Sequence, residues 1–453
     1  MSKRNFILLI IILIITIVIV FGFLYFSQPT SPTGDETEGT NFFSQFNPFG
    51  SGKTTTPPTT TPPVDISGDT GDQNPEIKQK LTKVSSMPIA GFTIFSKERL
   101  VAPVPILSSP SGEVPNGTVS TNIKLGTGTP TPPLTEFAPA LRYVERATGN
   151  IYQTFIDKIE ERRFTTTIIP KVYEAYFGNK AETVVMRYLK GDGRTIETFL
   201  GNLPKELLGG DTLENNEIKG SFLPNNIKDI SVSSDNGSIF YLFNVGDSMV
   251  GTTLNLTTNK KVQIFSSPFT EWLSWWPNNN TNKMITLTTK PSANILGYMY
   301  SMTETGKNFN KILGNINGLT TLTSPDGKQI LYSDNTLSLR IYNTDTKSSV
   351  LLGVKTLSEK CVWGSTSEVV YCSVPKLIDV GQYPDVWYQG EASFTDQFWK
   401  IDTKTGNATI IVDPTIINGG GEIDGTKLAL DNNENYLFFV NKKDSFLWKL
   451  GLK

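Results

Sequence analysis

The residues with the most specific chemistry in this sequence are its two cysteines, Cys361 and Cys372. They flank a turn-forming segment, so a hairpin that pairs Trp363 with Val370 also places the two cysteines opposite each other. We predict a disulfide between them, which requires an oxidising compartment; two buried free thiols are the alternative. Thiol catalysis is not favoured, because the chain has no histidine that could activate a cysteine.

The absence of histidine excludes several other kinds of site. None of the 453 residues is a histidine, which removes Ser-His-Asp and Cys-His nucleophiles and every zinc site with an imidazole ligand. Two cysteines are too few for four-thiolate zinc or iron–sulfur sites. The acidic residues do not show the spacing of a calcium-binding loop, so we predict no metal and no cofactor. Chemistry based on carboxylates stays possible.

A long segment between two predicted strands, residues 375–397, contains the best candidates for a contact surface. Long excursions from a rigid scaffold often carry binding residues, and aromatic rings supply contact area at a low cost in entropy. The alternative is that these rings pack between neighbouring structural units. The candidate binding residues are Tyr383, Trp387, Tyr388, Phe394, Asp385 and Glu391.

A second aromatic group, Trp272, Trp275 and Trp276, precedes an Asn-rich turn. Such a group can form a platform on which sugar rings stack. We expect instead that at least two of the three fill a core between sheets, where large aromatic side chains are commonly packed.

The N-terminus predicts a membrane anchor. Residues 6–26, from Phe6 to Phe26, are almost entirely apolar and long enough to cross a bilayer as a helix. Lys3 and Arg4 precede this segment and no basic residue follows until Lys53, so residues 1–5 are expected in the cytoplasm and the rest outside it. A cleaved signal peptide is the alternative, but the segment is longer than usual and no cleavage motif follows.

Residues 27–80 predict a disordered linker. They are rich in Thr, Pro, Ser and Gly and include two runs of three threonines, each followed by two prolines. Such a composition cannot bury enough apolar surface to offset the entropy of ordering the chain. We therefore expect a spacer between the membrane and a domain at residues 81–453.

The remaining residues repeat a pattern of polar turn and short apolar strand. A turn precedes each of Tyr241, Tyr332, Tyr371 and Phe439, and strand–turn–strand segments follow. The spacing corresponds to a period of ~40 to 50 residues, which is typical of propeller blades with four antiparallel strands. We predict an all-β, seven-bladed propeller, with six or eight blades as alternatives. The expected blades are residues 90–160, 163–210, 218–266, 268–314, 317–354, 357–413 and 423–453.

The last predicted blade is one strand short. Residues 81–84, Leu-Thr-Lys-Val, precede the first blade and could supply the missing strand. Pairing the two ends of the domain in this way would close the ring and remove two open sheet edges.

One repeat also carries a family resemblance. The segment Ser-Pro-Asp-Gly-Lys-Gln-Ile-Leu-Tyr at residues 324–332 resembles the WD40-like repeat of periplasmic TolB-type propellers, and residues 233–241 are a weaker copy. The resemblance implies the propeller fold and a role in protein interactions outside the cytoplasm. The chain departs from TolB-type proteins in having an anchor and linker where they have a separate small domain.

The balance of acidic and basic residues excludes nucleic acid as an expected partner. The 41 basic and 43 acidic residues give a net charge of −2, which lacks the positive field that nucleic-acid binding requires. We predict a single-pass, extracytoplasmic propeller that binds a protein or a glycan and is not an enzyme. A glycoside hydrolase or lyase that uses two carboxylates is the alternative.

Overall fold

The computed structural model describes residues 81–101, 134–208, 216–277, 284–417 and 419–453. The predicted cytoplasmic segment, membrane span and linker, residues 1–5, 6–26 and 27–80, lie outside the described residues. Within the described ranges, no helix is both long and apolar enough to cross a membrane. The described residues belong to one compact unit.

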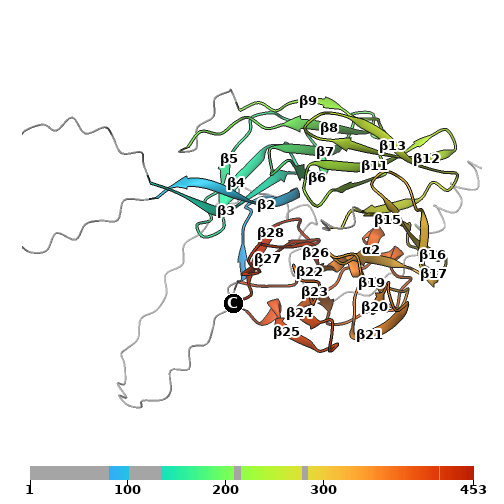
Figure 1. Cartoon of the computed structure of the whole chain (residues 1–453). Helices are drawn as coiled ribbons and strands as arrows, with labels where there is room; N and C mark the ends of the chain where they lie inside the picture. Colours follow the sequence, from blue (N-terminus) through green and yellow to red (C-terminus); the bar gives the residue numbers. More distant parts are fainter. Residues whose placement is uncertain (1–80, 102–133, 209–215, 278–283, 418) are drawn as a thin grey trace, which may run out of the picture. The chain divides into compact units, whose positions relative to one another are not determined.

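The described residues form seven antiparallel sheets of four strands each, which confirms the predicted all-β, seven-bladed propeller (Figure 1). In each sheet from blade 1 to blade 6, the four strands lie in chain order. The first strands of neighbouring sheets contact one another, as β2 (Ile89–Leu100) contacts β6 (Val172–Gly178). These first strands therefore line the middle of the ring, and the fourth strands lie at its outer edge.

Blade 1 consists of β2, β3 (Thr135–Glu145), β4 (Ile151–Phe155) and β5 (Arg162–Arg163). Blade 2 consists of β6, β7 (Thr183–Leu189), β8 (Ile196–Asn202) and β9 (Lys219–Phe222). Blade 3 consists of β10 (Asp229–Val232), β11 (Ser238–Val245), β12 (Ser248–Asn255) and β13 (Lys261–Ser267). Blades 4 and 5 consist of β14 (Trp272–Trp275), β15 (Met284–Thr289), β16 (Leu296–Thr303) and β17 (Asn310–Asn317), then β18 (Thr320–Thr323), β19 (Gln329–Ser333), β20 (Ser338–Asn343) and β21 (Ser348–Lys355). Blade 6 consists of β22 (Cys361–Trp363), β23 (Val369–Pro375), β24 (Asp396–Asp402) and β25 (Ala408–Val412). Blade 7 consists of β26 (Gly425–Leu430), β27 (Tyr436–Asn441), β28 (Leu447–Gly451) and β1 (Leu81–Lys83).

The predicted boundaries of blades 2 and 3 were wrong by about one strand. Strand β9 pairs with β8 and is the outer strand of blade 2, whereas the sequence had suggested that blade 3 begins there. Its four residues are all exposed, so they lack the apolar alternation that marks a strand in a sequence.

The core consists of clusters between consecutive blades, including one between the last blade and the first. In that cluster Leu141 and Tyr143 of blade 1 pack with Phe438 and Leu447 of blade 7. The ring is therefore closed by the same kind of apolar packing that joins every other pair of blades. Trp272 and Trp276 are buried between blades 3 and 4, as expected, and Trp275 is exposed.

The two ends of the domain pair in blade 7, which confirms the predicted closure. Strand β1 pairs with β28 in an antiparallel register that places Leu81 opposite Leu450. Val84, directly after β1, is buried in the cluster between blades 7 and 1.

The polar turns that the sequence singled out connect first strands to second strands. In blade 5 the Ser324 hydroxyl donates to Asp326 at 2.6 Å and accepts from the Gln329 amide at 3.0 Å. Ser233 makes the same two bonds in blade 3, to Asp235 and from Ser238. These local bonds fix the turn before each second strand, which explains why this pattern is visible in the sequence.

Candidate functional site

One face of the propeller carries the connections from second to third strands and from each blade to the next. On most blades the connection between the second and third strands is short. In blade 6 it runs from residue 376 to residue 395, between β23 and β24, and contains the helix α2 (Asp385–Gln389). We call this segment the blade 6 insertion, and the face that carries it the insertion face.

Three of the predicted contact residues are buried inside the insertion. The side chains of Tyr383, Trp387 and Phe394 are at most 5% exposed, and they pack with Leu337 and Leu357 of blade 5. The rings of Tyr383 and Phe394 lie 5.7 Å apart, and those of Trp387 and Phe394 lie 6.4 Å apart. These rings therefore form a small core, and the expectation of an exposed aromatic surface has to be corrected for these three.

Polar contacts hold the insertion against three other blades. The Asp385 carboxylate accepts hydrogen bonds from the Ser292 hydroxyl at 3.1 Å and the Ala293 amide at 2.7 Å, both in blade 4. The hydroxyl of Tyr388 bonds to Glu359, in the short helix η2 (Ser358–Lys360) that joins blades 5 and 6. On blade 7, the Lys442 ammonium donates to the backbone carbonyl of Trp387. The blade 6 insertion thus lies across part of the insertion face, where these bonds hold it in place.

Beneath α2 lies a fully buried group of charges. The Lys360 ammonium is 2.8 Å from a carboxylate oxygen of Asp396 and also pairs with Asp424, and all three side chains are completely buried. The Trp387 indole N–H donates to Asp424 at 2.9 Å, and the backbone N–H of Phe394 donates to the same oxygen at 3.1 Å. The Lys360 ammonium also lies 5.3 Å from the Trp387 ring and 5.1 Å from the Phe394 ring.

This arrangement leaves two carboxylates to one cation. Burial raises the pKa of Asp396, the nearby Lys360 charge opposes that rise, and the Asp424 charge adds to it. The Gly425 amide donates to Asp396 at 2.7 Å, and the Ser373 hydroxyl also donates to it. Since a buried charge is tolerated only when it is paired and hydrogen-bonded, these contacts make the charge group a fixed anchor for the insertion.

The sequence did not indicate this charge group. Asp396 is one of several acidic residues in segment 375–397, and Lys360 and Asp424 belong to no motif in the sequence. Lys360 directly precedes Cys361, and Asp424 follows the buried Ile423 in a Gly-rich connection. The position of a charged residue directly beside a residue expected in the core, as for Lys360 and Asp424, was the sequence feature that could have indicated a buried charge.

The outer surface of the insertion exposes apolar side chains. Leu377 is 75% exposed and Val380 is fully exposed. Ile416, in the short helix η3 (Pro414–Ile416), is 82% exposed. Lys376 bonds to Thr415 at 3.0 Å and pairs with Asp413 at 2.8 Å, so the segment with Leu377 lies beside the segment with Ile416. We call Leu377, Val380 and Ile416 the insertion patch. Of the predicted contact residues, Tyr388 and Glu391 are exposed.

The middle of the ring contains two carboxylates on neighbouring first strands. Glu174 of β6 pairs with the Arg187 guanidinium, and Asp229 of β10 accepts from both the amide and the hydroxyl of Ser274 at 2.6 Å. Burial raises the pKa of Asp229 to about 6; the bonds from Ser274 oppose the rise, and the Glu174 charge supports it. Both carboxylates are therefore held by fixed protein partners. No group of three residues suited to bind a metal ion occurs in the described ranges.

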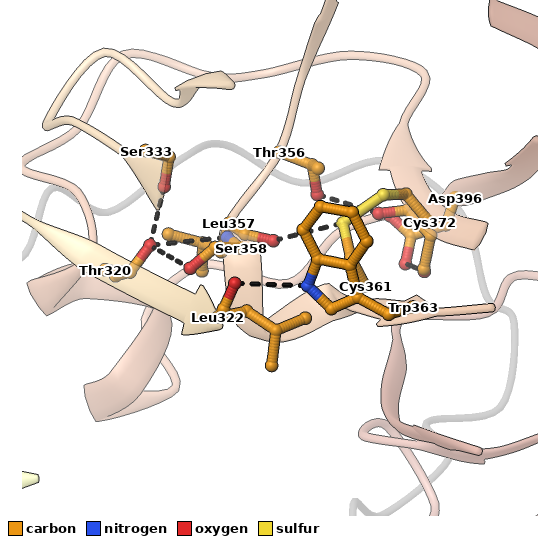
Figure 2. Close-up of a disulfide and its surroundings, with 11 residues drawn as sticks. Thr320, Leu322, Ser333, Thr356, Leu357, Ser358, Cys361, Trp363, Cys372 and Asp396 are labelled. Carbon is orange, nitrogen blue, oxygen red and sulfur yellow. Dashed lines mark hydrogen bonds between the residues drawn. A yellow bond between two sulfur atoms is a disulfide. The ribbon is translucent and has the colours of Figure 1, made fainter. Parts of the chain in front are cut away.

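The two cysteines lie directly opposite each other on β22 and β23 and are joined by a disulfide (Figure 2). The bond is buried between blades 5 and 6, where the Trp363 indole N–H donates to the carbonyl of Leu322 at 3.1 Å. Lys360 of the charge group immediately precedes Cys361 in the chain. The disulfide thus secures the blade from which the insertion emerges.

The sequence matches no protein-family model and no curated protein. Solved structures with a similar arrangement include an oligogalacturonate lyase from Vibrio parahaemolyticus, which is 9% identical, with a TM-score of 0.46 over 69% of this chain and 86% of that one. Another is an oligogalacturonate lyase in complex with manganese, which is 10% identical, with a TM-score of 0.48 over 69% of this chain and 85% of that one. Likeness at this level carries no information about the activity of this chain.

Proposed function

We propose that this chain is a membrane-tethered, extracytoplasmic propeller that binds a protein partner through the insertion face. The observation that carries this proposal is the insertion patch: Leu377, Val380 and Ile416 are exposed on two segments that are tied together by Lys376. Leu377 and Ile416 lie on segments held side by side, and exposed apolar side chains that gather on a rigid scaffold are typical of protein contact sites. The predicted anchor at residues 6–26 and the resemblance to TolB-type repeats agree with such a role.

Rigidity supports a role in binding. The buried rings of Tyr383, Trp387 and Phe394 and the bonds of Asp385 hold the insertion in one conformation. A partner would therefore bind a preformed surface, and little ordering entropy would oppose association. Tyr388 and Glu391 are exposed on the same insertion, where the Glu391 carboxylate can supply a polar contact.

The alternative is a glycoside hydrolase or lyase that uses carboxylates in the middle of the ring. Glu174 and Asp229 are the acidic residues that such a mechanism would use. In this structure Glu174 pairs with Arg187 through one carboxylate oxygen, and Asp229 accepts from Ser274 through one of its own. A carboxylate mechanism would have to use the second oxygen of each residue or break these bonds.

The test is affinity capture from an envelope extract with the full chain and two double variants. Leu377→Ser with Val380→Ser removes part of the patch and leaves the buried rings in place. Val350→Ser with Leu351→Ser is the matched control, because it changes one exposed valine and one exposed leucine on the outer strand β21 of blade 5. We expect the patch variant to weaken binding of the captured partner by about tenfold or more and the control to leave it unchanged. Equal binding by both variants would refute the assignment of the patch.

A further inference from the structure

A cleft of about 570 Å³ opens on the insertion face at blades 7, 1 and 2, away from the insertion patch. It lies between the connection of β3 to β4, the connection of β27 to β28 and the beginning of β6. The residues that line it are Pro88, Glu145, Arg146, Ala147, Lys171, Val172, Tyr173, Lys442, Lys443, Asp444 and Ser445.

The cleft has more positive than negative charge. Within the described part of the chain, Arg146, Lys171 and Lys442 form no salt bridge, and the Arg146 guanidinium donates to the neutral Ser445 hydroxyl at 2.8 Å. The two acidic lining residues bond to neutral donors instead: Glu145 accepts from Thr148, and Asp444 accepts from Asn441 and from the Phe446 amide. Lys443 alone has a carboxylate partner, Glu422, at 2.7 Å. Arg146 and Lys171 are therefore exposed in the cleft without a carboxylate partner among the described residues, whereas the partly buried Lys442 has the charges of Asp424 and Glu359 nearby.

Further cations lie behind the cleft. The Arg187 guanidinium is 5.3 Å from the centre of the Tyr173 ring, and the Lys427 ammonium donates to the Ala90 carbonyl at 2.8 Å. Burial lowers the pKa of Lys427; the Glu174 charge opposes this, and the charges of Arg146 and Arg187 lower it further. These cations repel one another, and a bound anion would relieve the repulsion.

Two buried polar atoms at or next to the cleft have no hydrogen-bond partner among the described residues: the hydroxyl of the lining residue Tyr173, and Nε of Arg187, whose guanidinium lies over the Tyr173 ring. Arg187 as a whole is only 6% exposed, and its other nitrogens bond to Glu174 and to backbone carbonyls. A buried donor without an acceptor is costly, so the site is suited to a ligand that brings acceptor oxygens.

We propose that this cleft binds a small molecule with several oxyanion groups, held by Arg146, Lys171 and Lys442. The volume is in the range of small-molecule sites, and the three cations come from three different segments of the lining, which suits a ligand with several oxyanion groups. The site is independent of the proposed protein contact, although Lys442 also bonds to the carbonyl of Trp387 in the insertion.

The test is calorimetric titration of the full chain with citrate, inorganic phosphate and a hexaglutamate peptide. The variants are Arg146→Gln and Lys171→Ala, both of exposed residues, so the fold is expected to persist and circular dichroism checks it. Lys404→Ala is the control, because Lys404 is an exposed lysine that pairs with Glu368 on the opposite face. We expect citrate to bind at one site, each cleft variant to weaken it about tenfold or more, and the control to bind as the unchanged protein does.

Several results would overturn the proposal. These are the absence of citrate binding, citrate affinity that is equal in the cleft variants and the control, and phosphate affinity equal to that of citrate. Binding of hexaglutamate without binding of citrate would reassign the cleft to an acidic protein segment. Weaker citrate binding as the salt concentration rises supports the proposal, because the contact is electrostatic. Partner capture by the patch variants is measured separately, so failure of one proposal leaves the other standing.

Discussion

At the scale of single residues, Lys360 is the one cation of the buried charge group beneath α2. Its ammonium pairs with both Asp396 and Asp424, and those carboxylates in turn accept hydrogen bonds from the insertion and from blade 7. A buried ion pair adds little net stability compared with apolar residues of the same size, but loss of one partner leaves an uncompensated charge. Lys360 therefore fixes the position of α2 more than it strengthens the fold.

Replacement of this cation should be strongly destabilising. For Lys360→Met we expect the free energy of unfolding to fall by about 3 to 5 kcal/mol at neutral pH, because two buried carboxylates then face each other. Denaturant unfolding of the variant and of Lys404→Met, the matched change at an exposed lysine, measures the effect. A loss of similar size in both variants would contradict the role of Lys360.

The same variant should depend on pH in a defined direction. The pKa of Asp396 is already raised by burial, and without Lys360 it rises further above its value in the unfolded chain. The folded variant then binds a proton more tightly than the unfolded chain does, so its stability falls as the pH rises above about 4 and is greatest in acid. Unfolding midpoints at pH 4.5 and pH 8 should therefore show a larger gap between variant and unchanged protein at pH 8.

The residues of the insertion also show what a sequence can and cannot predict. A long loop with many aromatic residues was visible in the composition of residues 375–397. Which rings are exposed was not, because burial of Trp387 depends on Asp424 and burial of Tyr383 depends on Leu337, residues from other blades. The turn at Ser324 was predictable because its bonds are local, whereas the charge group joins residues that are far apart in the sequence.

At the scale of elements, blade 6 contains most of the special features of the insertion face. It supplies the insertion, both cysteines and two members of the charge group, with Lys360 directly before β22 and Asp396 at the start of β24. The disulfide joins its first strand to its second, and the insertion leaves the end of that second strand. A firmly held β23 therefore gives the insertion a fixed starting point.

The disulfide should contribute measurably to stability. The cross-link spans 11 positions, and closing a loop of this size in the unfolded chain corresponds to about 3 kcal/mol. We expect the double variant Cys361→Ala, Cys372→Ala to lose about that amount in denaturant unfolding. Reductant should destabilise the unchanged protein and leave the double variant unaffected. No response of the unchanged protein to reductant under unfolding conditions would instead indicate two free thiols.

At the scale of the whole molecule, the ring is one closed series of sheets. The period of the turns predicted seven blades, and the missing strand of the last blade predicted the pairing of β1 with β28. The boundaries of blade 2 were not predictable, since β9 has no buried face. The repeat period therefore predicts the number of blades. The boundaries of single strands such as β9 depend on pairing with neighbouring strands, which exists only in the folded ring.

Loss of the closing strand should open the ring. Deletion of residues 81–84 removes β1 and the buried Val84, and we expect it to lower the free energy of unfolding by about 2 to 4 kcal/mol. The exposed edge of β28 should also promote self-association, which size-exclusion chromatography detects. The matched control deletes four residues of the predicted linker, 70–73. Equal stability and equal elution of the two deletions would show that the closure is dispensable.

The closing strand also sets an order of events during biosynthesis. Lys83 is made about 365 residues before Trp448, its partner across the sheet. At synthesis rates of about 5 to 20 residues per second, the first strand to emerge waits roughly 20 to 70 seconds for the last. During that interval β1 has no partner strand in the nascent chain. Chaperones that bind unpaired strand edges would therefore have the longest time to bind at β1.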